Sequence, residues 1–160
     1  MNKAVFLDRD GVLNHDPDDY TYKLEETHVL EGIIPFCKQV QEKGYLIIVI
    51  TNQGGIDKKV YGFDEVEAIH SYLQKEFQKE GVNITDFYYC PHHSALQKCL
   101  CRKPDSLMIE RAIHKYNIDP EKSYFIGDKW RDVECGQKAG VHGIKIDVNV
   151  IEPTLINQVR

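Results

Sequence analysis

Two aspartates lie two positions apart, directly after a short apolar run near the N-terminus. Asp8 and Asp10 follow the apolar residues 4–7. Alternate side chains of an extended segment point to the same side, so the two carboxylates can reach one point. Close carboxylates repel each other, and one must bind a proton unless a cation lies between them. Once Asp128 is added, the oxygen-only set favours a hard divalent ion, and Mg²⁺ with retained waters suits it.

Three further polar clusters accompany this pair. They are Thr51-Asn52-Gln53, Arg102-Lys103-Pro104, and the acidic and basic residues of the segment 127–132. Magnesium beside a lysine, a threonine and exposed backbone amides is an arrangement that binds phosphate oxygens. The clusters therefore predict chemistry on a phosphate group.

A compact group of cysteine and histidine residues is a second candidate metal site. Cys90, His92, Cys99 and Cys101 form a Cys-x-His…Cys-x-Cys set. Three thiolates and one imidazole are a closed tetrahedral ligand set, which is typical of structural zinc. Because no ligand position is left for water, this zinc is not expected to be catalytic. Its expected role is to pin a short loop immediately before Arg102 and Lys103.

Other interpretations of these residues remain open. The cysteines could be buried or redox-active residues, and His93 competes with His92 as the fourth ligand. The spacing favours His92. The other two cysteines, Cys37 and Cys135, fall on predicted apolar helix faces and are expected in the core.

Hydrophobic periodicity predicts the elements that must position these side chains. We expect strands at residues 3–7, 45–50, 86–90, 123–126 and 143–146, helices at 32–43, 63–80, 106–116 and 132–139, and a helical tail from 152. Regular strand–helix alternation predicts an α/β fold with a three-layer, Rossmann-like parallel sheet that has helices on both faces. Ligands bind such sheets beyond the carboxyl ends of the strands, where most of the polar clusters fall.

Length and composition set limits on the class of protein. The chain has 160 residues and a formal net charge of −5, with 42% hydrophobic and 28% charged residues. This composition is that of a globular protein, and residues 1–160 read as one domain. The acidic balance argues against a nucleic-acid partner, and no apolar run approaches the 18 residues of a membrane span. The N-terminal apolar run is too short for a signal peptide, so we expect a cytoplasmic protein. We also expect a monomer.

The motifs resemble, in order and spacing, those of the haloacid dehalogenase-like (HAD) phosphohydrolases, and the match spans residues 3 to about 146. The residues that carry it are Asp8-x-Asp10-Gly11-Val12, Thr51, Lys103 and Gly127-Asp128-x-x-x-Asp132. The resemblance implies that Asp8 attacks phosphorus to form an aspartyl-phosphate. It also implies that Asp10 protonates the leaving oxygen and then deprotonates the attacking water.

The same resemblance implies roles for the remaining residues. Mg²⁺ would be held by Asp8, the Asp10 carbonyl and Asp128, with Asp132 nearby or acting through water. Thr51 and Lys103 would hold the oxygens of the transferred phosphate.

The Cys/His group narrows the resemblance to two kinds of zinc-loop phosphatase. The stretch Cys90-Pro91-His92…Cys99-x-Cys101-Arg102-Lys103-Pro104 is similar to that of the D-glycero-D-manno-heptose 1,7-bisphosphate phosphatases and the histidinol-phosphate phosphatases. By similarity, Asn52, Arg102 and Lys129 would contact the sugar or its second phosphate. The heptose pattern departs after residue 56, where this chain has Asp57-Lys58-Lys59 in place of a small residue and an arginine.

These observations lead to one main hypothesis and two rivals. The main hypothesis is a Mg²⁺-dependent phosphatase that removes the 7-phosphate of heptose 1,7-bisphosphate. The rivals are a phosphatase of histidinol phosphate or another small sugar phosphate, and a non-catalytic zinc-stabilised binding module. With no inserted cap domain in the sequence, we expect an open pocket in which residues 14–28, Lys58, Lys59 and the zinc loop select the substrate.

Overall fold

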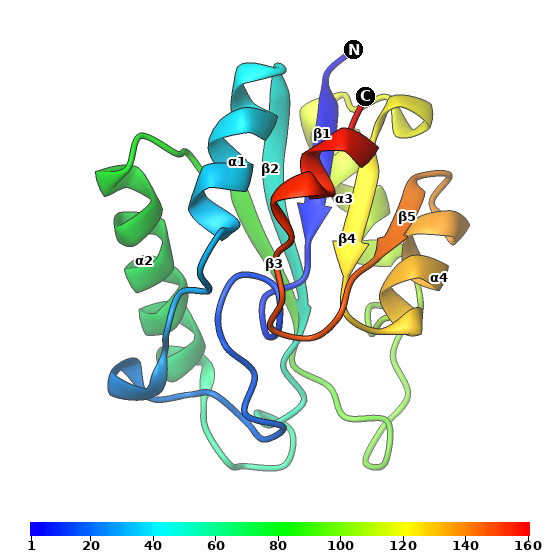
Figure 1. Cartoon of the computed structure of the whole chain (residues 1–160). Coiled ribbons are helices and arrows are strands. Elements are labelled where there is room, and N and C mark those ends of the chain that lie inside the picture. Colours follow the sequence, from blue (N-terminus) through cyan, green and yellow to red (C-terminus); the bar gives the residue numbers. More distant parts are fainter.

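Five parallel strands form one sheet in the computed structural model, which describes residues 1–160 (Figure 1). The strands are β1 (Lys3–Leu7), β2 (Tyr45–Asn52), β3 (Asp86–Cys90), β4 (Tyr124–Gly127) and β5 (His142–Lys145), in the spatial order β3-β2-β1-β4-β5. The predicted α/β fold with a parallel sheet is therefore confirmed. No helix of the structure combines the length and apolar character that crossing a membrane requires.

The central strands are apolar on both faces because helices cover both sides of the sheet. In β1, Val5 and Leu7 belong to one buried cluster, while Ala4 and Phe6 belong to the other. The neighbouring β2 alternates in the same way, which explains its uninterrupted apolar sequence. These two strands pair in register from Lys3 with Tyr45 to Leu7 with Val49.

The helices divide between the two clusters. The larger cluster is formed with α1 (Ile33–Glu42), α2 (Phe63–Lys79) and the C-terminal 3-10 helix η3 (Pro153–Gln158). The smaller cluster is formed with α3 (Leu107–Tyr116) and α4 (Trp130–Lys138). Figure 1 shows α1 and η3 in front of the sheet and α3 behind it. Two short 3-10 helices, η1 (Leu24–Glu26) and η2 (Pro120–Lys122), lie in connections.

Two element boundaries differ from the sequence prediction near the expected site. The strand β2 runs on through Asn52, so Thr51 and Asn52 belong to the strand rather than to the following loop. The helix α4 begins at Trp130 rather than at Asp132. Its first turn is stabilised by the Asp132 carboxylate, which accepts a hydrogen bond from the Lys129 backbone amide at 3.1 Å. The predicted helical tail is the 3-10 helix η3.

The order of the strands places a crevice at the carboxyl ends of β1 and β4. The chain proceeds outward from β1 to β2 and β3 and then returns to β4 on the other side of β1. Loops that leave β1 and β4 therefore diverge, and this divergence is where open α/β sheets bind ligands. The loop after β1, residues 8–32, is long and crosses this end of the sheet before α1 begins.

Candidate active site and metal centre

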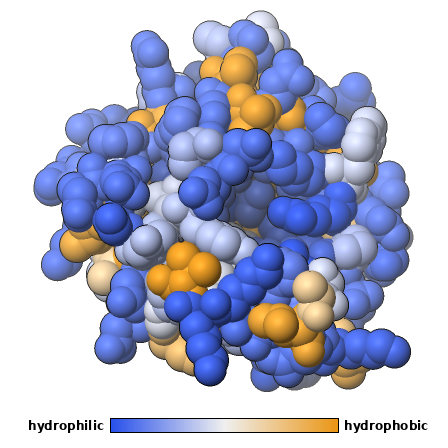
Figure 2. Space-filling view, turned by 90° about the horizontal axis from the view of Figure 1, so that it is seen from below, coloured by the Kyte–Doolittle hydropathy of each residue, from blue (hydrophilic) through white to orange (hydrophobic).

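A polar cleft of about 400 Å³ lies at the carboxyl ends of the strands. Figure 2 views the molecule from this end and shows a hydrophilic hollow near the middle of the face, with hydrophobic side chains scattered around it. The cleft brings together nearly every residue that the sequence singled out for this site: Asp8, Asp10, Thr51, Asn52, Arg102, Lys103, Asp128 and Lys129. Asp132 does not line the cleft, because it is fully buried beneath it.

Asp8 and Lys103 form a buried ion pair at the floor of the cleft. The Lys103 ammonium donates to Asp8 Oδ1 at 2.9 Å and lies 2.7 Å from Asp132 Oδ1. Burial, reinforced by the charge of Asp132, raises the pKa of Asp8 well above its usual range. Burial also opposes the charge on Lys103, but the Asp132 and Asp8 carboxylates outweigh it and raise the pKa of Lys103. Lys103 is thus a fixed positive charge beside the first aspartate.

Only one oxygen of Asp8 is engaged by the protein. Its Oδ1 accepts the Lys103 bond and a second from the backbone amide of Arg9 at 2.8 Å, whereas Oδ2 accepts none. A carboxylate held through one oxygen keeps the other oriented and available for attack on an electrophile.

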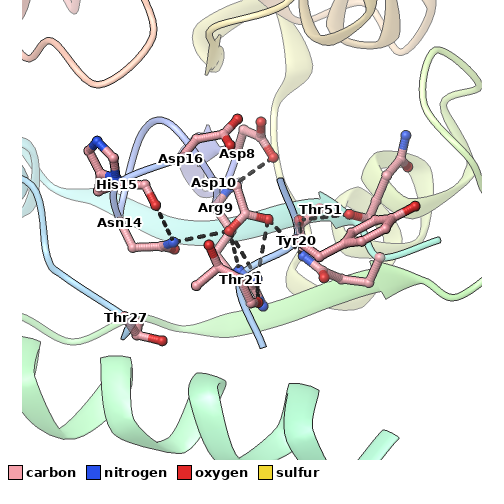
Figure 3. Close-up of polar contacts among 12 residues, drawn as sticks. Asp8, Arg9, Asp10, Asn14, His15, Asp16, Tyr20, Thr21, Thr27 and Thr51 are labelled. Carbon is pink, nitrogen blue, oxygen red and sulfur yellow. Dashed lines mark hydrogen bonds and ion pairs between the residues drawn. The ribbon is translucent and has the colours of Figure 1, made fainter. Parts of the chain in front are cut away.

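Asp10 lies in a different environment from Asp8. Its Oδ1 accepts hydrogen bonds from Arg9 Nη2 at 2.9 Å, Arg9 Nε at 3.1 Å and Asn14 Nδ2 at 3.0 Å, and Figure 3 shows these groups turned toward the Asp10 carboxylate. Burial alone would raise the pKa of Asp10, but the Arg9 guanidinium and the amide donors outweigh it and lower that pKa. Without a cation the pKa of Asp8 is therefore raised and that of Asp10 lowered, which is opposite to the order that a nucleophile at Asp8 and an acid at Asp10 require. A cation bound beside Asp8 would lower the pKa of Asp8 and favour its ionised form.

Two buried carboxylates, Asp8 and Asp128, are placed to hold a cation, and a third, Asp132, lies beside them. One oxygen from each of Asp8, Asp128 and Asp132 lies within 4.8 Å of the others. Both oxygens of Asp128 are buried without a hydrogen bond, and Lys129 Nζ lies 3.4 Å from Oδ2, so Oδ1 has no partner in the protein unless a cation binds it. Gly11 makes room for this carboxylate, because a Cβ at its φ of 89° would lie 2.7 Å from Asp128 Oδ2. The oxygen-only donor set fits Mg²⁺.

Thr51 and Asn52 support the site from β2. Thr51 is 1% exposed, and its hydroxyl accepts a hydrogen bond from Gln53 Nε2 at 2.9 Å. Asn52 donates to the Lys103 carbonyl at 3.2 Å and accepts from the Lys103 amide at 3.0 Å. Asn52 therefore fixes the main chain that carries Lys103, in addition to lining the cleft.

The Cys/His set also converges. Ligand atoms of Cys90, His92, Cys99 and Cys101 lie within 4.8 Å of one another, and His92 Nδ1 is 3.3 Å from Cys101 Sγ. His93, the competing ligand in the sequence, faces elsewhere: it lines the cleft, and its Nδ1 accepts from the Ala95 amide at 3.1 Å. All five cysteines are free thiols, and Cys37 and Cys135 are buried in the core as predicted. Three thiols and one imidazole at these separations fit a tetrahedral zinc ion.

Some residues that line the cleft were assigned from the sequence only as part of a loop, or not at all. Asp16, Asp18 and Asp19 lie in the segment 14–28 that was expected to select the substrate, whereas Arg131, in the first turn of α4, was assigned no role. Gln53 was visible beside Thr51 in the sequence, but nothing there indicated its contacts. Lys58 and Lys59, considered as substrate contacts, do not line the cleft.

Asp57 explains the turn that contains these two lysines. Its carboxylate accepts from the His93 amide at 2.9 Å and from Gln97 Nε2 at 2.8 Å. Asp57 thus ties this turn to the loop that carries the Cys/His set.

Comparisons with known proteins agree with this fold. A family model described as HAD-hydrolase-like matches residues 100–158. The D-glycero-beta-D-manno-heptose-1,7-bisphosphate 7-phosphatase of Haemophilus ducreyi is 39% identical over 145 residues, which cover 87% of this chain and 79% of that protein. The corresponding alpha-anomer phosphatase of Campylobacter jejuni is 39% identical over 147 residues, covering 92% and 83%.

A solved structure extends the agreement to three dimensions. The D,D-heptose 1,7-bisphosphate phosphatase of B. bronchiseptica, complexed with magnesium and phosphate, superposes with a TM-score of 0.83 at 27% identity, covering 88% of this chain and 78% of that one. The chain belongs to the HAD-like hydrolases and, within them, to the family of the D-glycero-D-manno-heptose-1,7-bisphosphate 7-phosphatases.

Proposed function

We propose that this protein is a Mg²⁺-dependent phosphatase that removes the 7-phosphate of D-glycero-D-manno-heptose 1,7-bisphosphate through an aspartyl-phosphate intermediate. The observation that carries the proposal is the Asp8 carboxylate at the carboxyl end of β1. One of its oxygens is held by Lys103 at 2.9 Å and the other is free within a polar cleft. Relatives that carry this activity in their names, at 39% identity, support the choice of substrate.

In the first step, Asp8 Oδ2 attacks phosphorus and the bond from phosphorus to the sugar oxygen breaks. Asp10 gives its proton to that oxygen, which leaves as an alcohol. The arriving phosphate places negative charge beside Asp10 and increases its affinity for the proton it must donate. Lys103 and Thr51 hold the oxygens of the transferring group, where negative charge is concentrated.

In the second step, water attacks the phosphorus of the aspartyl-phosphate. Asp10 accepts a proton from this water, and the bond between phosphorus and Asp8 breaks to release inorganic phosphate. The Asp10 carboxylate is the same group in both steps, so its proton is returned within one cycle.

Mg²⁺ would be held by Asp8, Asp128 and the Asp10 carbonyl, and when bound it supplies positive charge to the phosphate oxygens. Asp132 would act on Lys103 rather than on the metal, because its Oδ1 is 2.7 Å from Lys103 and its Oδ2 accepts from Lys129. We propose a structural zinc ion at Cys90, His92, Cys99 and Cys101. Free thiols throughout the chain support a reducing, cytoplasmic location.

The cleft is lined by both basic and acidic side chains, and the basic ones suit a second phosphate. Its basic residues beside Lys103 are Arg102, Lys129 and Arg131, and the loop after β1 contributes Asp16, Asp18 and Asp19. A bisphosphate sugar would place its reacting phosphate at Asp8 and its other phosphate at these basic residues, with its hydroxyls toward the acidic ones.

The test is phosphate release from heptose 1,7-bisphosphate, fructose 1,6-bisphosphate and histidinol phosphate, with Mg²⁺ and with EDTA. We expect Mg²⁺-dependent release that is fastest with the heptose and abolished by Asp8→Asn. The matched control is Asp64→Asn, the same change at an exposed position on α2, which should leave the rate unchanged. Activity that persists in EDTA or in the Asp8 variant would contradict the mechanism, and a preference for histidinol phosphate would contradict the substrate.

A further inference from the structure

A buried chain of hydrogen bonds connects Tyr61, through Gln53, to Asp10 and to Thr51. The Tyr61 hydroxyl donates to Gln53 Oε1 at 2.6 Å. The amide group of Gln53 then donates to Asp10 Oδ2 at 3.0 Å and to Thr51 Oγ1 at 2.9 Å. Tyr61 is 7% exposed and Gln53 is 2% exposed, so water does not compete freely for these bonds.

The chemistry of the partners fixes the direction of the Gln53 amide. An ionised carboxylate only accepts hydrogen bonds, so Asp10 requires the NH₂ end of Gln53. The carbonyl end must then meet a donor, and the Tyr61 hydroxyl is that donor. Burial raises the pKa of Tyr61 above its usual value, so the hydroxyl keeps its proton. A flipped amide would set two acceptors, Oε1 and Asp10 Oδ2, against each other in a buried site.

Gln53 contacts the oxygen of Asp10 that remains for chemistry. Asp10 Oδ1 already receives three bonds from Arg9 and Asn14, whereas Oδ2 receives only Gln53 at 3.0 Å and a longer contact from Arg9 at 3.2 Å. The side chain of Asp10 is 26% exposed toward the cleft. Gln53 and Arg9 together therefore fix where this oxygen lies relative to a bound leaving group, and Gln53 makes the shorter contact.

The ring of Tyr61 is held in place from two sides. A Cβ on Gly55 would lie 2.1 Å from Tyr61 Cε1, so only glycine at this position admits the ring. On the other side, Tyr22 stacks on Tyr61 at 5.4 Å and Tyr20, which lines the cleft, meets its edge at 5.8 Å. The tyrosine thus couples the loop after β1 to the amide that contacts Asp10.

We propose that Tyr61 is a positioning residue for the general acid: it orients the Gln53 amide, which fixes the Asp10 carboxylate at the leaving-group oxygen. The inference rests on the proposed role of Asp10. Its consequence is selective, because help from a general acid matters for a poor leaving group such as a sugar alkoxide and little for a good one. Loss of Tyr61 should therefore impair sugar phosphates and spare p-nitrophenyl phosphate, whose phenolate leaves without a proton.

The experiment measures the first step alone, in single turnovers with Mg²⁺-loaded enzyme in excess over substrate. For Tyr61→Phe we expect the rate with heptose 1,7-bisphosphate to fall roughly tenfold to a hundredfold, and the rate with p-nitrophenyl phosphate to stay within about twofold. The enzyme concentration at which this rate is half-maximal should change little. Tyr72→Phe, which removes a hydroxyl without a hydrogen-bond partner on α2, is the matched control and should match the unmodified protein with both substrates.

Further variants separate the possible failures. Gln53→Glu sets a second carboxylate against Asp10 and should show the same selectivity with a larger loss. If circular dichroism shows that Tyr61→Phe is unfolded, Gln53→Glu provides the test in its place. Equal loss with both substrates, or no loss, in folded Tyr61→Phe and Gln53→Glu would overturn the inference. Asp10→Asn should show the leaving-group selectivity as well. If it does not, or if Asp8→Asn remains active, it is the proposed function that fails.

Discussion

His70 provides a prediction whose size follows directly from its surroundings. The imidazole lies on α2, 5% exposed, stacked on Phe87 at 4.6 Å with its Nε2 3.4 Å from Arg9 Nη1. Burial, reinforced by the positive charge of Arg9, lowers the pKa of His70 to about 3. The neutral ring is therefore part of the support behind Arg9, which in turn holds Asp10. The expected consequence is a loss of stability in mild acid.

The sign and size of this loss follow from proton linkage. Between the unfolded pKa of about 6.5 and the folded value of about 3, the unfolded chain binds a proton that the folded protein does not bind. Stability therefore falls as the pH drops through this window. From pH 7.5 to pH 5.5 the contribution of His70 amounts to about 1.4 kcal/mol of unfolding free energy.

The assay is urea unfolding at pH 7.5, 6.5 and 5.5 for the unmodified protein and for His70→Gln, at constant Mg²⁺ and Zn²⁺. The variant removes the titrating group, so its loss of stability between pH 7.5 and 5.5 should be smaller by about 1.4 kcal/mol. Costs of the substitution that do not depend on pH cancel in this difference. His114→Gln, at an exposed position on α3, should behave as the unmodified protein. If His70→Gln retains the full pH dependence, the ring is charged in the folded state and the reasoning is wrong.

Three further predictions concern the site. Lys103→Met should lower kcat/KM by about 10²–10³-fold and destabilise the protein by roughly 3–5 kcal/mol, because it leaves buried carboxylates unpaired. Activity assays and thermal melts measure the two effects, with Lys75→Met at an exposed position as the control. Asn149→Gly keeps the left-handed backbone at φ 64° but removes both hydrogen bonds to the main chain of Asp16. In steady-state kinetics we therefore expect KM to rise about tenfold and kcat to change less. Removing zinc with a chelator in excess Mg²⁺ should lower the melting temperature by more than about 5 °C, and elemental analysis that finds no zinc in the purified protein would contradict the site.

The parts of the fold and site that the sequence predicts are those defined over short distances. The apolar run of β2 identifies a strand buried on both faces, and Asp8 and Asp128 follow their strands directly, so their convergence follows from a parallel sheet. The Cys/His spacing similarly predicts the cluster at Cys90. Each inference needs only local periodicity and one rule of topology.

The residues that the sequence does not reveal are defined by contacts between distant segments. Asn149 reaches Asp16 across 133 positions, and His70 reaches Arg9 across 61. Neither residue stands in a recognisable motif, and a polar side chain in a helix or loop usually faces solvent. Lys58 and Lys59 show the opposite error. Their positive charge suggested that they contact the substrate, but the turn fixed by Asp57 keeps them out of the lining of the cleft.

The loop after β1 lines the cleft through residues 16 and 18–21, and its anchors hold it at this position. Asn149, after β5, holds the backbone of Asp16 through two hydrogen bonds. Arg9, after β1, donates to the Thr21 carbonyl at 3.0 Å, and Tyr61, after β2, stacks on Tyr22. Because these anchors come from segments that follow three different strands, the loop is tied to the same edge of the sheet that carries Asp8. We therefore expect the loop to be in place before substrate binds, so hydrogen exchange of residues 16–22 should slow only slightly when a bisphosphate sugar binds to the Asp8→Asn protein. Strong protection would show that the loop closes on the substrate instead.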